Sequence, residues 1–241
     1  MPLDRALLSA TLCLLSTPLA AEAGETQISV DVAAVSALHD RGEQVTREAL
    51  QFGAGVQVEV QDASVYGAVY RLLPVGSQQE AFDDEAGFTL GTAWNTETYS
   101  ADISANFLTF PGEEAESTVE LAGAVSIHTV FTPVLIGFYD ADFEDWGLEL
   151  TGGPEWEAGE WTIYALGRAG FVQPGDDSAH RSYAGVEWGA VRPVSDSVEF
   201  SLFARSDIAD EESFIQRMQG GEITSMRNSG VAAGINLSIS R

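Results

Sequence analysis

The stretch Tyr99-Ser100-Ala101-Asp102-Ile103-Ser104-Ala105-Asn106-Phe107 alternates between apolar and polar side chains. Successive side chains of a β-strand point to opposite faces, so this segment has one apolar and one polar face. The same period of two recurs around Val56, Leu121, Ile163 and Ile235. No stretch of comparable length after residue 23 has a helical period. We therefore expect an all-β chain.

The alternating segments are long and evenly spaced. We expect twelve strands, at about 26–38, 47–60, 63–75, 85–95, 98–110, 117–128, 131–141, 146–157, 160–172, 182–193, 197–209 and 228–240. An even number of strands is typical of a closed single-chain barrel. Pro133 and Pro154 make the strands at 131–141 and 146–157 the least regular, because proline cannot donate a hydrogen bond within a sheet.

The connections alternate in length. The longer ones are 39–46, 76–84, 111–116, 142–145, 173–181 and 210–227, and tight turns join the other strand ends. This alternation predicts an antiparallel up-and-down barrel with both termini on the periplasmic side of an outer membrane. The last connection carries Phe214, Ile215 and Met218, so it can fold inward and cap the mouth of the barrel.

Alternation alone does not determine whether the apolar face of the strands points into the barrel or out toward lipid. Segments of 10–14 residues match the length that a tilted strand needs to cross a bilayer, which favours a transmembrane barrel. Aromatic residues at segment ends favour two interfacial girdles: Trp94, Tyr99, Trp146, Trp156, Trp161 and Phe171. A soluble, secreted ligand-binding barrel is the alternative, with the apolar face turned inward.

The first 23 residues have the pattern of a secretory signal. Arg5 precedes the apolar run from Ala6 to Leu15, and Ala21-Glu22-Ala23 is a cleavage site of the A-x-A type. We therefore expect residues 1–23 to be removed, together with Cys13, and residues 24–241 to form the barrel. An exported barrel of this kind belongs in the outer membrane of a Gram-negative bacterium.

Charge and residue usage exclude several function classes. The 241 residues carry a formal charge of −26, from 37 acids against 11 bases, and every base is Arg. Nucleic-acid binding needs a basic surface, so it is excluded. The single Cys excludes a cysteine zinc site, and His39, His128 and His180 lack the spacing of metal ligands. We expect no cofactor and no metal at a catalytic centre.

The polar face of the strands carries charge. The strand register turns the following residues toward the lumen: Asp31, Glu59, Asp102, Glu120, Glu149, Arg168, Glu187, Glu199, Arg205 and Asp207. Carboxylates that line a pore favour cations. We therefore predict a narrow, mildly cation-preferring channel for passive diffusion of small solutes. The alternative is a non-conducting structural or interaction barrel, whose lumen acid–Arg pairs would close.

One pair of residues permits a catalytic hypothesis. Ser126 and His128 lie on one face of one strand, as in a serine–histidine hydrolase. Such neighbours arise easily in a serine-rich strand, and neither a Gly-x-Ser-x-Gly turn nor a phosphate loop is present. The sequence therefore predicts that the chain is not an enzyme.

The longer connections are acidic. The runs comprise Glu80, Asp83, Asp84 and Glu85; Glu113, Glu114 and Glu116; Asp140, Asp142, Glu144 and Asp145; Asp176 and Asp177; and Asp210, Glu211 and Glu212. Solvation of an exposed rim explains them. Divalent cations that bridge to lipopolysaccharide phosphates are the alternative. We expect outer-membrane lipid and lipopolysaccharide as partners, and a monomer.

Two short motifs resemble a known family. Gly55-Val56 lies in an Ala/Gly-rich strand, and Phe107-Leu108-Thr109-Phe110-Pro111-Gly112 is followed by Glu120-Leu121-Ala122-Gly123. In these motifs the chain resembles Gram-negative outer-membrane β-barrel porins, most closely the TorF-type porins, which implies a barrel channel. The turn His39-Asp40-Arg41-Gly42 departs from that family's aromatic-Arg-Gly turn. The end Ile239-Ser240-Arg241 lacks the terminal aromatic residue that serves assembly in many such barrels.

Overall fold

The computed structural model describes residues 26–77, 79–82, 84–110, 117–176 and 178–241. The predicted signal, Cys13 and the acids Asp83, Glu113, Glu114, Glu116 and Asp177 lie outside these residues. Thirteen strands form one antiparallel sheet: β1 (Thr26–Val35), β4 (Ala49–Val60), β5 (Ala63–Pro74), β6 (Glu85–Asn95), β7 (Tyr99–Thr109), β8 (Ser117–Ile127), β9 (Val134–Asp140), β10 (Trp146–Gly152), β11 (Glu155–Ala158), β12 (Trp161–Gln173), β13 (Arg181–Ser195), β14 (Val198–Ala209) and β17 (Ser229–Ser240).

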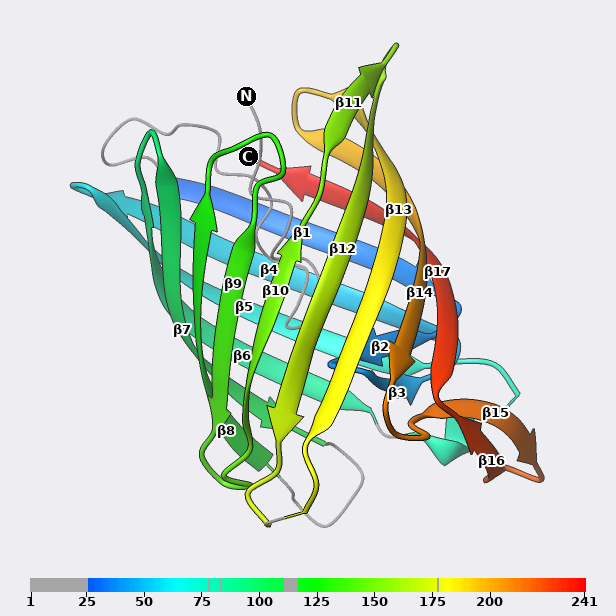
Figure 1. The fold of residues 1–241 in the computed structure, drawn as a ribbon. Helices are drawn as coiled ribbons and strands as arrows, with labels where there is room; N and C mark the ends of the chain where they lie inside the picture. Colours follow the sequence, from blue (N-terminus) through cyan, green and yellow to red (C-terminus); the bar gives the residue numbers. More distant parts are fainter. Residues whose placement is uncertain (1–25, 78, 83, 111–116, 177) are drawn as a thin grey trace.

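The sheet closes into a twelve-stranded barrel, as predicted (Figure 1). Each strand pairs with the next one of the wall, β17 returns to β1, and β12 pairs with both β10 and β11. The last two are therefore successive parts of one wall strand. Gly153-Pro154 interrupts it, because proline cannot donate a hydrogen bond to the neighbouring strand. The neighbouring strand β9 begins at Val134, directly after Pro133, and is shorter than predicted.

The barrel has two unlike ends. At the terminus end β1 begins, β17 ends, and tight turns such as Gln61-Asp62 join neighbouring strands. At the loop end lie the longer connections, with the 3-10 helix η1 (Gln79–Ala81) and two small hairpins. One hairpin is β2 (Leu38–Asp40) with β3 (Glu43–Thr46), and the other is β15 (Phe214–Gln219) with β16 (Glu222–Arg227). Figure 1 shows β15–β16 at the opposite end of the barrel from the C-terminus.

The apolar face of the strands points outward. Leu90 is 64% exposed, and Ile103 and Val231 are similarly exposed on other strands. The buried positions of the same strands include Ser29, Asp31, Asn106 and Glu149. A soluble barrel would bury its apolar face, so this arrangement is that of a transmembrane barrel. In the described part of the chain, no helix has the length and apolar character to cross a bilayer.

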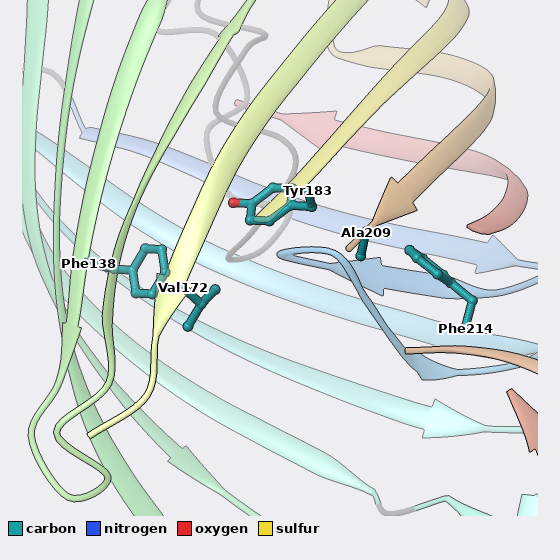
Figure 2. Packing of buried hydrophobic residues seen from close by; sticks show 5 residues of the cluster. All are labelled: Phe138, Val172, Tyr183, Ala209 and Phe214. Atoms are coloured by element: carbon teal, nitrogen blue, oxygen red, sulfur yellow. The ribbon is translucent and has the colours of Figure 1, made fainter. Parts of the chain in front are cut away.

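A small apolar core lies inside the barrel near the loop end. Phe138, Val172 and Tyr183 project from the wall and lie near Ala209 and Phe214 (Figure 2). Phe214 is fully buried at the start of β15. The wall residues of this cluster come from β9, β12, β13 and β14, which lie close together in the wall, and Phe214 of β15 packs on them, so part of this end of the barrel is filled.

Candidate functional site

The β2–β3 hairpin folds into the lumen from the loop end. Arg41 and Gly42 join its two strands, and both have positive φ angles, 43° and 79°. Two positive φ values in a two-residue turn are typical of the type I′ hairpin. The resulting tight turn places the Arg41 side chain at the tip, where it reaches wall strands far along the chain.

Arg41 connects this tip to β8 and β9. Its Nη1 donates a hydrogen bond to Glu120 at 2.5 Å, and its guanidinium lies 3.6 Å from the ring centroid of Phe138. Burial opposes the charged form, but Asp40 and Glu120 outweigh it and raise the pKa of Arg41. The arginine therefore stays cationic, and the hairpin tip holds a permanent positive charge inside an acidic lumen.

His39 connects the hairpin to β14. Its Nδ1 lies 2.8 Å from Asp207 Oδ2, and Arg205 Nε donates to the same oxygen at 2.6 Å. The His39 ring also packs edge-on against Phe214 at 5.0 Å. With Arg41 bound to β8 and His39 bound to β14, contacts on separate parts of the wall hold the hairpin.

The last connection closes over the hairpin. The Gln44 amide donates to the Ser213 carbonyl, the Ser213 hydroxyl donates to the Gly42 carbonyl, and the Ile215 amide donates to Gln44 Oε1. The predicted inward folding of residues 210–227 therefore holds for their first residues. The rest forms β15–β16, turning at Gly220 and Gly221, which both have positive φ. The two connections together narrow the loop end of the lumen.

The structure places the ten predicted lumen residues on the inner face: Asp31, Glu59, Asp102, Glu120, Glu149, Arg168, Glu187, Glu199, Arg205 and Asp207. It brings two pairs of them together. Arg168 Nη2 lies 3.0 Å from Glu187 Oε2, and Arg205 contacts Asp207. The role of these residues in lining a pore stays a prediction.

Inward-facing tyrosines hold other carboxylates against the wall. Tyr66 donates to Asp102 at 2.9 Å, and Tyr183 donates to Glu149 at the same distance. The sequence pattern did not single out these tyrosines, and it marked His39 only as lacking metal-ligand spacing and, with Arg41, as part of a turn that departs from the family pattern. Gly42, between the short apolar-bearing segments 38–40 and 43–46, is the local signal for a turn, because glycine suits the second position of a type I′ hairpin. Nothing local in the sequence indicates that the hairpin turns inward.

The six predicted girdle aromatics, Trp94, Tyr99, Trp146, Trp156, Trp161 and Phe171, all occupy outward register positions. Trp146 and Phe171 meet edge-to-face at 5.3 Å on neighbouring strands. Trp161 packs against Phe200 in the same way at 6.3 Å. Their contact with membrane interfaces stays a prediction.

In the structure His128 pairs with Ser100, whereas the catalytic hypothesis from the sequence paired it with Ser126. Its Nε2 lies 2.8 Å from the Ser100 hydroxyl on β7, and its Nδ1 lies 3.4 Å from the Glu97 carbonyl. Acidic loop residues accept local hydrogen bonds, as Asp140 does from the amides of Asp142 and Phe143. Among the described residues, no group of three or more His, Cys, Asp or Glu side chains is arranged to hold a metal.

Known proteins resemble this chain in fold and not in sequence. No family model matches the chain, and no curated protein matches its sequence. The COG4313 outer membrane channel from Pseudomonas putida F1 superimposes with a TM-score of 0.54 at 9% identity, over 92% of this chain and 97% of that one. The KdgM porin gives 0.50 at 6%, over 88% and 98%. LpxR from Salmonella typhimurium gives 0.53 at 10%, over 88% and 99%.

These comparisons correct the prediction that the chain is not an enzyme. The similar structures include LpxR, a deacylase, which superimposes with the TM-score of 0.53 given above. The fold class therefore includes enzymes, and a barrel architecture does not argue against catalysis. What the comparisons establish is the fold: this chain has the architecture of bacterial outer-membrane β-barrel proteins.

Proposed function

We propose that the protein is a narrow channel of the bacterial outer membrane that lets small solutes diffuse passively, with a mild preference for cations. The observation that carries the proposal is the charge of the inner face. Eight of the ten charged residues placed there are carboxylates and two are arginines. A negative lumen attracts cations and repels anions.

The two halves of the lumen differ in charge balance. Toward the loop end, Arg41, Arg168 and Arg205 each contact a carboxylate. Toward the terminus end, Asp102 accepts hydrogen bonds from the neutral Tyr66, and Glu59 accepts one from Gln57. Neutral donors leave the negative charge uncompensated. We therefore assign the cation preference to the terminus half and the narrow passage to the loop half.

Planar-bilayer recording of the refolded protein under a salt gradient tests this function. We expect stepwise currents with a reversal potential on the cation side. Asp102→Asn removes one uncompensated charge and should move the reversal potential toward zero. Glu80→Gln, in the exposed η1, is the control and should leave it in place. An unchanged reversal potential in Asp102→Asn would contradict the assignment of the preference to this half.

The hairpin contacts favour a second candidate, a non-conducting barrel with a structural or interaction role. Arg41 joined to Glu120, and His39 joined to Asp207, hold β2–β3 within the lumen. In a closed barrel, the folded wild type gives no current, and replacing residues 38–46 with a short Gly-Ser linker produces currents. Currents in the wild type would reject this candidate, and silence in both proteins would reject the channel.

Location, family and partners belong to the same proposal. An acidic inner face and an apolar outer face suit a barrel surrounded by outer-membrane lipid, with lipopolysaccharide and divalent cations at the acidic loops. We retain removal of residues 1–23, a monomeric state and the TorF-type resemblance as proposals. Membrane fractionation tests the location. N-terminal sequencing of the purified protein tests the removal of residues 1–23, and its mass in detergent tests the monomeric state.

A further inference from the structure

A cluster of oxygen atoms lies on the inner face where β1, β17 and β14 meet. Asp31 on β1 lies opposite Ser238 on β17, and Ser238 lies opposite Glu199 on β14. Residues opposite one another in neighbouring strands project from the same face of the sheet. The two acidic side chains therefore flank the Ser238 hydroxyl, and the charge of Glu199 acts on Asp31.

Two oxygens in this cluster lack hydrogen-bond partners. Asp31 is only 5% exposed, and its Oδ2 is buried without a donor. Ser238 and Asn236 both hydrogen-bond to Asp31, and the buried Oδ1 of Asn236 also lacks a donor. A buried polar atom without a partner indicates strain or a missing water or ion. Both atoms here are acceptors, so the missing group carries positive charge or donates hydrogen bonds.

The unsatisfied atoms elsewhere in the described lumen are of mixed type. Near the loop end, an unpartnered nitrogen of Arg205 and an unpartnered oxygen of Asp207 lie on the same strand, β14. Unpartnered nitrogens of Arg168 and an unpartnered oxygen of Glu149 lie on the neighbouring strands β12 and β10. Water, which both donates and accepts, satisfies such a mixture. Around Asp31 the unpartnered atoms are acceptors, and two carboxylates repel each other across one hydroxyl. A cation both satisfies the unpartnered acceptors and neutralises the repulsion between the carboxylates, whereas water only satisfies the acceptors.

We propose that Asp31, Asn236, Ser238 and Glu199 bind one divalent cation of the Ca²⁺ type. The donors are hard oxygens, two of them from carboxylates, and Ca²⁺ accepts six to eight such ligands in flexible geometry. Water in the lumen completes the shell. Mg²⁺ fits less well, because it demands a nearly ideal octahedron and gives up its water reluctantly. Gly53, opposite Asp31 on β4, carries no side chain that would cover this position.

This site would be a specific binding position for the cations that the proposed channel prefers. It rests on the proposed function in one respect, which is that ions enter the lumen. A cation that dwells here would lie on the path of permeating ions. Binding itself requires no current, so a barrel that does not conduct can still bind calcium. The two proposals therefore fail separately.

Isothermal titration of CaCl₂ into the refolded full chain in detergent tests the site. We expect one saturable component near one ion per chain, and at least tenfold weaker affinity in Asp31→Asn and in Glu199→Gln. Asp62→Asn is the matched control, because it removes one carboxylate from an exposed turn at the terminus end. Wild-type affinity in Asp31→Asn would overturn the proposal and assign calcium binding to the acidic loops.

Thermal unfolding with and without a chelator provides a second readout. We expect EDTA to lower the Tm of the wild type and of Asp62→Asn, and to leave that of Asp31→Asn unchanged, because that variant has no ion to lose. Should Asp31→Asn fail to fold, Ser238→Ala keeps both carboxylates and should weaken calcium binding several-fold. Equal EDTA effects on all folded variants would also overturn the site.

Discussion

At the residue scale, Gly42 allows the hairpin to pass beside the barrel wall. Its φ angle is +79°, and a Cβ atom built there would lie 2.5 Å from Cβ of Tyr183. Gly159, in a turn at the terminus end, also has a positive φ, but nothing lies within 4 Å of its Cβ position. The two glycines therefore share the same backbone demand and differ in the space around them.

This difference gives a paired prediction. Gly159→Ala should lower the free energy of unfolding by about 1 kcal/mol, because alanine at this position must adopt a left-handed backbone conformation. Gly42→Ala adds the clash with Tyr183 and should cost about 3 kcal/mol in total, because overpacking adds a further 1–3 kcal/mol. Urea unfolding in lipid vesicles, followed by tryptophan fluorescence, measures both. Equal losses in the two variants would mean that the hairpin does not pack against Tyr183.

At the element scale, titration of Asp40 controls how firmly the β2–β3 hairpin is held. Burial raises the pKa of Asp40 to about 7, with Glu120 and Glu149 adding to the rise and Arg41 and Arg205 opposing it. In a released hairpin the same carboxyl would titrate near its ordinary value of about 4. The held hairpin therefore binds more protons between these values, and its stability falls as pH rises from about 4 to about 7.

A spin label reports this dependence. In protein that lacks residues 1–23, and so lacks Cys13, Val45→Cys supplies one attachment point on β3, and its side chain is exposed. We expect the label to be less mobile at pH 5 than at pH 8 in electron paramagnetic resonance spectra. Asp40→Asn keeps the shape without the charge and should remove the difference. The same mobility at both pH values in the Asp40 protein would contradict the assignment.

At the scale of the whole molecule, the outward apolar belt decides where the barrel is stable. Leu90 occupies the middle of β6 and faces outward. Leu90→Arg should destabilise the protein in lipid vesicles by about 2–4 kcal/mol, as expected for arginine near the bilayer midplane. Val130→Arg, in an exposed turn at the terminus end, should cost about 0–1 kcal/mol, because that turn lies near the interface.

The same variants separate a membrane barrel from a soluble one. Vesicle-refolded protein titrated with urea gives the free energy of unfolding of each variant. Leu90→Ala, which removes the apolar side chain without adding charge, should fall between the wild type and Leu90→Arg. Wild-type stability of Leu90→Arg in buffer without detergent would favour a soluble secreted barrel.

The sequence by itself determined the barrel wall. The period of two in segments such as Tyr99–Thr109 places each side chain on one of two faces, and this depends only on neighbouring residues. For that reason the alternation of side chains along each strand places Asp102 and Glu120 on the inner face without knowledge of the fold. Proline chemistry is equally local, and it anticipated the irregular wall at Pro133 and Pro154.

Only the tertiary structure decided what fills the lumen. Arg41 and Glu120 lie 79 residues apart, and His39 and Asp207 lie 168 apart. A local pattern gives the face of a residue but not its partner across the barrel, because closure sets which strands confront each other. The inward turn of β2–β3 and the positions of Asp31 and Glu199 on either side of Ser238 depend on that closure, which joins the first strand to the last.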